Sequence, residues 1–182
     1  MENKNVLIIK GSGRKDSFTN RLCLEAEAAL GNCHIDVFDT FKESFLPCDG
    51  CNYCEKHGKC VHRDLDSFFG MFEGADLIIF ASPVYNGTFP APLKALIDRF
   101  QCYYTAFYGN GKVQPIKKRR KAIFIAASGR DGEKSIDFMK WQLGCAFSIL
   151  NIELIETILC SYTDTAPGYD KALEDLNRSL AL

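Results

Sequence analysis

Histidine, charge of one sign and long apolar runs are all scarce in this sequence. Its 182 residues include only three histidines, and the formal net charge is −1. Balanced charge creates no global field that would attract a nucleic acid or an acidic membrane surface. No apolar run approaches the length of a membrane-spanning helix. We therefore expect neither a nucleic acid nor a membrane as a partner.

The beginning of the chain does not resemble a secretory signal. Residues 2–5 are charged or polar, and the apolar run that follows covers only four residues, Val6–Ile9. Such a run is far shorter than the apolar core of a signal peptide. We therefore expect a cytoplasmic protein.

Motifs of hydrolytic catalysis are missing as well. The sequence contains no Gly-x-Ser-x-Gly elbow and no His-Glu-x-x-His motif, and its histidines do not form a hydrolytic set. One run of consecutive basic residues occurs, Lys117–Lys121. Because no wider basic surface accompanies it, we expect a solvated turn there rather than a nucleic-acid site.

Cysteine, in contrast, is abundant. The chain has nine cysteines, and an odd number without a secretory signal argues against a disulfide framework. Four of them, Cys48, Cys51, Cys54 and Cys60, fall in one short segment. The others are scattered, and we expect them to be ordinary core or surface residues.

Five short apolar runs alternate with helical patterns along the chain. The runs are Val6–Lys10, Ile35–Asp39, Leu77–Ala81, Ala122–Ala127 and Leu154–Cys160. Three of them are apolar throughout and predict buried strands, whereas the second and the fifth are mixed and predict strands near the sheet edges. Helices are expected at Thr19–Leu30, Leu65–Phe72, Pro92–Phe100, Ser135–Leu150 and Tyr169–Leu182.

This alternation predicts an α/β fold with a parallel sheet and helices on both faces. At this chain length the flavodoxin-like order of five strands, 2-1-3-4-5, is the leading candidate. We expect a single domain, residues 1–182, with a cysteine-rich insertion loop at about 47–61. An aromatic segment, Cys102–Tyr108, lies outside any clear element, and we expect it to form a subunit interface or to cover a ligand.

Three loops are expected to meet at the carboxyl edge of the sheet, where ligands bind in open α/β folds. The first, Gly11–Asn20, joins a buried strand to a helix and contains hydroxyls, glycines and Arg14. A helix N-terminus with an arginine beside it suits a phosphate. The loop matches neither a Walker A motif nor Gly-x-Gly-x-x-Gly, and alone it is equally consistent with an ordinary strand-to-helix turn.

The other two loops follow the third and fourth strands. Ser82–Pro90 brackets an aromatic residue, an amide and a glycine with prolines, which suits the edge of a flat heterocycle. Ser128–Glu133 is flexible and rich in hydrogen-bond donors. Together the three loops predict a ligand that combines a phosphate with a planar ring.

These segments resemble the NAD(P)H-dependent FMN reductase branch of the flavodoxin-like superfamily. The resemblance lies in GSGRKDSFTNRL, in ASPVYNGTFPAPLKALIDR and in AASG, and it covers nearly the whole chain. It implies non-covalent FMN in a homodimer or homotetramer. The residues implied to hold the phosphate are Ser12, Arg14, Ser17, Thr19 and Asn20; those implied to contact the isoalloxazine are Pro83, Val84, Tyr85, Asn86 and Gly87, with Ser128 and Gly129 closing over it.

Two positions depart from that family's pattern. Gly13 stands where members commonly carry proline, and Phe18 stands where they carry asparagine, so one side-chain donor to the phosphate is absent. Asp16 would repel a dianion if it faced inward. We expect it to face solvent, near the positive end of the first helix.

The grouped cysteines have the spacing C-x2-C-x2-C-x5-C. Compact runs of this kind are typical of [4Fe–4S] ligation, and this one is similar to that of the iron–sulfur flavoproteins, a subgroup of the same superfamily. Zinc is an alternative, although structural zinc sites usually separate their two cysteine pairs by a dozen or more residues. A third alternative is a loop of free thiols without a metal.

Three functions follow from these alternatives. With a cluster, the protein would pass electrons between a ferredoxin-like partner and FMN. Without one, NAD(P)H would reduce the flavin directly, with a quinone, free flavin or oxygen as acceptor. The third is a non-enzymatic flavin carrier or partner-binding module with a zinc-ordered loop. In each redox case the flavin does the chemistry, so no side-chain nucleophile or general base is expected.

Overall fold

The computed structural model describes residues 4–181. Its five strands form one sheet in the order β2-β1-β3-β4-β5, and every pairing is parallel. The strands are β1 Asn5–Lys10, β2 His34–Asp39, β3 Leu77–Pro83, β4 Arg120–Ala127 and β5 Ile152–Cys160. The expected strand order and the flavodoxin-like architecture are confirmed.

The burial of each strand explains its position in the sheet. Strands β1, β3 and β4 are almost wholly buried, as their uninterrupted apolar sequences predict, because helices cover both of their faces. Strands β2 and β5 mix buried residues with exposed and half-buried ones and lie at the two edges. Both edge assignments made from sequence are confirmed.

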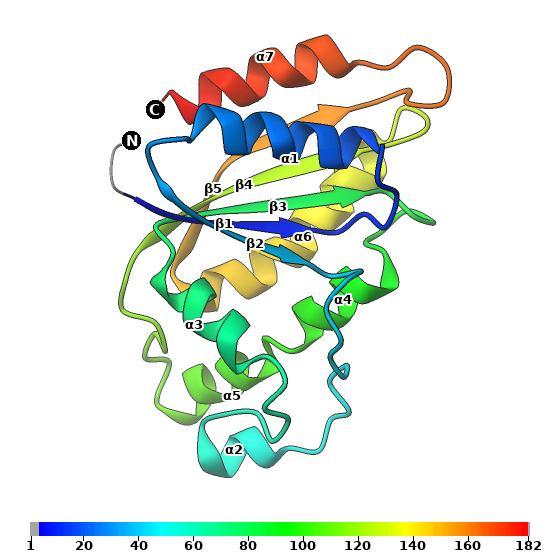
Figure 1. Ribbon diagram of the computed structural model, residues 1–182. Coiled ribbons are helices and arrows are strands. Elements are labelled where there is room, and N and C mark those ends of the chain that lie inside the picture. The colour runs from blue at the N-terminus through cyan, green and yellow to red at the C-terminus, as the bar shows by residue number, and fades with distance from the viewer. Residues whose placement is uncertain (1–3, 182) are drawn as a thin grey trace.

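Seven helices pack on the two faces of this sheet or extend from it within the described chain (Figure 1). Helices α1 Phe18–Ala29 and α7 Tyr169–Leu180 lie on one face. The other face carries α3 Asp66–Gly74, α4 Ala91–Asp98, α5 Gln101–Gly109 and α6 Glu133–Leu150. The short α2, Tyr53–His57, lies within the cysteine loop.

Alternation of side chains along each strand divides the core into two parts. In β1, Val6 and Ile8 join the cluster under α1 and α7, whereas Leu7 and Ile9 join the cluster under α3 to α6. The second cluster is the larger and is rich in stacked phenylalanines, such as Phe72 and Phe100 with ring centroids 4.8 Å apart. A rigid sheet thus supports the loops at its carboxyl edge.

The aromatic segment Cys102–Tyr108 differs from expectation, because it is part of a helix, α5. Cys102 and Tyr103 are buried in the core, whereas Tyr104 and Tyr108 are exposed. The helix packs against α2 and α6 and contributes no residue to the cavity described below. The prediction that this segment covers the ligand within one chain is therefore wrong, and its role in a subunit interface stays a prediction.

The basic run also differs from a simple solvated turn. Lys117, Lys118 and Arg119 are exposed, but Arg120 begins β4 and is 1% exposed. Its guanidinium donates hydrogen bonds to the carbonyls of Phe72 (2.6 Å) and Leu150 (2.5 Å). Burial lowers the pKa of Arg120 to about 10. Arg120 therefore links α3 to α6 through its hydrogen bonds. The basic sequence of residues 117–121 does not predict this structural role.

None of the helices within residues 4–181 combines the length and the apolar character that crossing a bilayer requires. The cytoplasmic location stays a prediction.

Candidate functional site

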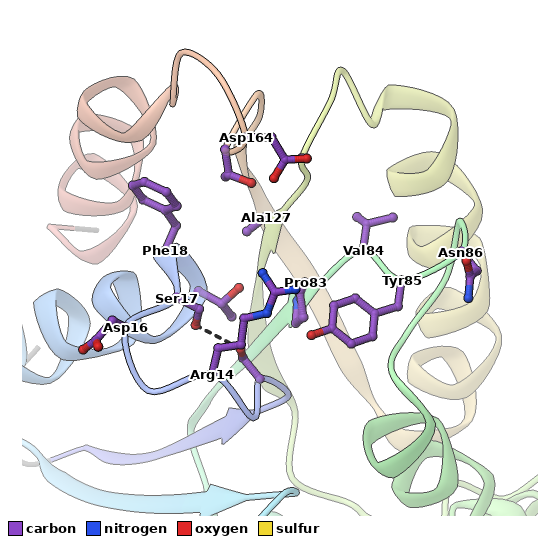
Figure 2. A pocket seen from close by; sticks show the side chains of 14 residues that line it. Arg14, Asp16, Ser17, Phe18, Pro83, Val84, Tyr85, Asn86, Ala127 and Asp164 are labelled. Atoms are coloured by element: carbon purple, nitrogen blue, oxygen red, sulfur yellow. Dashed lines mark hydrogen bonds between the residues drawn. The ribbon is translucent and has the colours of Figure 1, made fainter.

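A cavity of about 540 Å³ opens at the carboxyl edge of the sheet. Its volume lies in the range of small-molecule and cofactor sites. The loops after β1, β3, β4 and β5 all contribute to it, and Figure 2 shows their side chains converging. The lining residues are Ser12, Arg14, Asp16, Ser17, Phe18, Thr19, Pro83, Val84, Tyr85, Asn86, Ala127, Gly129, Thr163 and Asp164.

The loop before α1 is built around an N-cap. Ser17 caps the helix, and its Oγ accepts a hydrogen bond from Asn20 N (3.1 Å) and one from Ser12 Oγ (2.9 Å). The Asn20 amide donates to the carbonyl of Arg14 (2.7 Å) and does not line the cavity. Asn20 therefore shapes the loop from behind, rather than facing the cavity as the other residues implied for the phosphate do.

The first turn of α1 suits an anion. The N–H groups of Phe18 and Thr19 have no acceptor within the helix, as in any first turn, and the helix dipole favours negative charge there. Thr19 is fully buried, and its Oγ1 has no hydrogen-bond partner. Arg14 is exposed at the cavity. A buried, unpaired hydroxyl beside a cation and free N–H groups fits the phosphate of FMN.

Asp16 does not oppose this assignment. The residue is exposed, and Figure 2 shows its carboxylate pointing away from Arg14. Asp16 is thus accessible to solvent, as expected, although it also lines the cavity.

Phe18 packs against Tyr169 of α7, with ring centroids 5.7 Å apart. Arg21 completes this group, because its guanidinium lies 4.2 Å from the Tyr169 centroid. The aromatic residue that stands in place of the family's asparagine therefore closes the α7 side of the cavity.

The loop after β3 is a tight hairpin turn. Tyr85 and Thr88 exchange both backbone hydrogen bonds (2.9 and 3.0 Å), and Asn86 and Gly87 both have positive φ, 50° and 83°. This is the type I′ geometry that Asn-Gly favours. The turn presents the Tyr85 ring, 38% exposed, toward Arg14 (Figure 2). Gly87 shapes the turn without lining the cavity.

The loops after β4 and β5 meet at Gly129. Ser128 is buried behind the lining, whereas Gly129 faces the cavity. Asp164 lies so close to Gly129 that any Cβ there would clash with its carboxylate. The sequence analysis did not predict Thr163 and Asp164, because it assigned the cavity to the loops after the first, third and fourth strands. The loop after β5 also follows the carboxyl end of a parallel strand, and this position could have predicted its contribution.

The cysteine segment forms a second, separate site on α2 and α5. Cys48, Cys51, Cys54 and Cys60 line one small cavity of about 30 Å³, which shares no lining residue with the larger one. Among residues 4–181, no three cysteine, histidine or acidic side chains converge closely enough to hold a metal ion. The four thiols therefore lie around one cavity, and they would have to move closer together to bind a metal ion or a cluster.

Neighbouring groups order this loop. Asp49 accepts hydrogen bonds from Cys51 N (3.1 Å) and pairs with His62 Nε2 (3.2 Å). A hydrogen bond from the Cys51 thiol, followed by those from Cys51 N and His62, lowers the pKa of the Asp49 carboxyl. A fifth cysteine, Cys102 of α5, also lines the cavity, although sequence analysis assigned it to the scattered group. Burial raises the pKa of its thiol to about 12, so the isolated thiol stays protonated.

Curated proteins similar to this chain include flavoproteins of two kinds. An iron-sulfur flavoprotein of Methanocaldococcus jannaschii is 35% identical over 133 residues, which cover 71% of this chain and 66% of that protein. An FMN-dependent NADH:quinone oxidoreductase of Pseudomonas fluorescens is 28% identical over 117 residues, covering 60% of this chain and 56% of that protein. The chain therefore spans about two thirds or less of the length of these relatives.

Solved structures share the fold at low sequence identity. An NAD(P)H:quinone oxidoreductase from Methanothermobacter marburgensis has a TM-score of 0.75 at 18% identity. The match covers 98% of this chain and 94% of that protein's chain. An azoreductase from Bacillus anthracis has a TM-score of 0.70 at 21% identity and covers 99% of both chains. A model of one family, NADPH-dependent FMN reductase, matches residues 4–152. The chain belongs to the NADPH-dependent FMN reductase family.

Proposed function

We propose that this protein is an FMN-dependent oxidoreductase in which a [4Fe–4S] cluster, held by Cys48, Cys51, Cys54 and Cys60, exchanges electrons with FMN. The observation that carries the flavin assignment is the large cavity, with an unpaired buried hydroxyl at the start of α1 and a tyrosine-bearing turn opposite. Membership of the FMN reductase family supports it. The name of the Methanocaldococcus jannaschii relative supports the cluster.

The chain's own residues bind and orient the flavin in this proposal. Thr19 Oγ1, the first N–H groups of α1 and Arg14 bind the phosphate. The type I′ turn fixes the Tyr85 ring and offers backbone groups to the isoalloxazine, and Gly129 leaves room beside Asp164. Bound FMN supplies hydride and single-electron chemistry, and the protein supplies binding, orientation and potential.

The donor set supports a cluster in the cysteine loop. Four thiols line one cavity, and thiolates are the usual ligands of iron–sulfur clusters. Such a cluster supplies single-electron transfer. We further propose a ferredoxin-like protein or NAD(P)H as the electron donor, and a homodimer or homotetramer as the assembly.

A second candidate is a reductase without a cluster. It is favoured by the small volume of the cysteine cavity and by the lack of a converged ligand set among residues 4–181. In that case NAD(P)H would deliver hydride directly to the flavin. The relative from Pseudomonas fluorescens, an FMN-dependent NADH:quinone oxidoreductase by name, supports this candidate.

Anaerobic purification, followed by a visible spectrum and analysis of FMN, iron, sulfide and zinc, distinguishes these functions. The proposal expects stoichiometric FMN and about four irons with matching sulfide per chain. Stoichiometric FMN without iron, with rapid anaerobic bleaching by NADH or NADPH, would support the cluster-free reductase. One zinc without redox activity would support a binding module. Absence of FMN affinity in folded protein would overturn the flavin assignment itself.

Two serine variants provide a matched comparison for the cluster. Cys48→Ser removes a thiol from the loop, whereas Cys145→Ser removes an exposed thiol from α6, far along the chain. We expect iron to fall sharply in the first variant only, with FMN content unchanged in both. Equal iron in the two variants would contradict the proposed ligands.

A further inference from the structure

One buried arginine joins the two ends of the cysteine loop. Arg99 Nη1 donates to the carbonyl of Leu46 (2.7 Å), just before the loop, and Nη2 donates to the carbonyl of His62 (3.0 Å), just after it. Nη2 also donates to Asp64 Oδ1 (2.8 Å). Because Asp64 Oδ2 accepts from Leu46 N (2.7 Å), these residues form a closed ring of hydrogen bonds at the neck of the loop.

This ring depends on the shape of a guanidinium. Its planar fork can bond two carbonyls and a carboxylate at once, whereas the single ammonium of lysine cannot reproduce that geometry. The Arg99 side chain is 0% exposed, and a buried cation requires partners of this kind. Hydrogen bonding to Arg99 and to Leu46 N outweighs the opposing effect of burial and lowers the pKa of Asp64.

The position of Arg99 in the fold makes this neck rigid. The residue caps the C-terminus of α4 and precedes Phe100, the N-cap of α5, whose ring stacks on Phe72 in the core. Its backbone is therefore held by the main hydrophobic cluster, not by the loop that it closes. Movement of the neck would have to break the ring or displace core residues.

The same guanidinium faces the cysteines. Arg99 lines the small cavity together with all four of them, and it interacts electrostatically with Cys60. Its Nε is buried and has no hydrogen-bond partner. The Arg99 guanidinium therefore places a fixed positive charge beside the thiols, where a cluster ligated by thiolates would be anionic.

We propose that Arg99 is a positioning residue for the cysteine site, which closes the neck of the loop and presents a charged donor to the sulfur atoms of the cluster. This inference rests on the proposed function. Mutation of residues that hydrogen-bond to metal ligands and orient them commonly lowers metal affinity by about 10- to 100-fold. A nearby cation stabilises the reduced, more negative state of a cluster, and it therefore raises the reduction potential.

Two variants of Arg99 and one control test this inference. Arg99→Gln removes the charge and most of the ring, and Arg99→Lys keeps the charge without the fork. Arg120→Lys is the control, because it removes the other fully buried guanidinium, which bonds to α3 and α6 rather than to the loop. It therefore reports how much of any effect comes from a general loss of stability.

The first measurement does not need a cluster. In apoprotein, we expect alkylation of Cys54 and Cys60, which are half-buried, and amide exchange in residues 47–61 to be about tenfold faster in both Arg99 variants than in wild type, because charge-assisted hydrogen bonds at the neck of the loop are lost. Arg120→Lys should leave both rates at the wild-type value. Unchanged rates in Arg99→Gln would overturn the inference.

The second measurement uses ferrous iron and sulfide in anaerobic reconstitution. We expect both Arg99 variants to need about 10- to 100-fold more iron for half-loading, and the loaded fraction of Arg99→Gln to have a lower midpoint potential by EPR titration, with FMN content unchanged. If Arg99→Gln takes up iron and is reduced at the same midpoint potential as wild type, the inference about Arg99 is overturned and the proposed cluster is not. Failure of wild type to take up iron would overturn the proposed cluster, and the inference with it.

Discussion

The unpaired hydroxyl of Thr19 allows a test in which apoprotein and flavin-bound protein respond in opposite directions. Thr19→Val keeps the branched shape and removes Oγ1, which is buried without a partner. Burial of an unpaired hydroxyl costs about 1–3 kcal/mol. We therefore expect the variant to stabilise the apoprotein by about 1 kcal/mol or more.

The same substitution should weaken FMN binding. If Oγ1 donates to the phosphate, its loss removes a hydrogen bond to a charged group, which is worth about 1.5–3 kcal/mol. Since about 1.4 kcal/mol is tenfold in affinity, the dissociation constant of FMN should rise about 10- to 100-fold. Flavin fluorescence titration of stripped protein measures this change, and urea unfolding of the apoprotein measures stability.

Thr40→Val is the matched control. Thr40 is equally buried, but its hydroxyl donates to the carbonyl of Lys10 (3.0 Å) and lies outside the cavity lining. Its variant should lose about 1 kcal/mol of stability and bind FMN as wild type does. Wild-type FMN affinity in Thr19→Val, or a loss of apoprotein stability like that of the control, would refute the assignment of Thr19 to the phosphate.

Three other predictions concern stability. Arg120→Met should lose about 2–4 kcal/mol in urea unfolding, because it leaves two buried carbonyls of α3 and α6 unpaired; a loss below about 1 kcal/mol would contradict this. A hydrogen bond from Lys118 lowers the pKa of Asp76, so the stabilising effect of that carboxylate is complete above about pH 4 and is lost as pH falls further. The stability difference between wild type and Asp76→Asn, about 1 kcal/mol at neutral pH, should shrink toward pH 3, and a constant difference would refute the pairing. Gly87→Ala should cost about 1 kcal/mol through its positive φ alone, since no atom lies closer than 3.8 Å to the added Cβ; an unfolding midpoint equal to wild type would show that the turn relaxes.

Sequence periodicity was sufficient for the sheet, because burial on both faces leaves a continuous apolar run and an edge position leaves a mixed one. Val6–Ile9 and the alternating β2 show the two cases. Three of the loops that meet at the cavity could also be predicted, because the carboxyl ends of parallel strands lie at one edge. The strand positions and the meeting of these loops could be predicted because they depend on local sequence or on a general rule of sheet topology.

The tertiary structure alone decided which residues of those loops face the cavity, because that depends on contacts between distant segments. Asn20 and Ser128 lie behind the lining, while Asp164 enters it from a loop that sequence analysis did not consider. The roles of Arg99 and Arg120 were also invisible in sequence. Both guanidiniums bond to carbonyls tens of residues away, and no local pattern records a partner that only folding brings near.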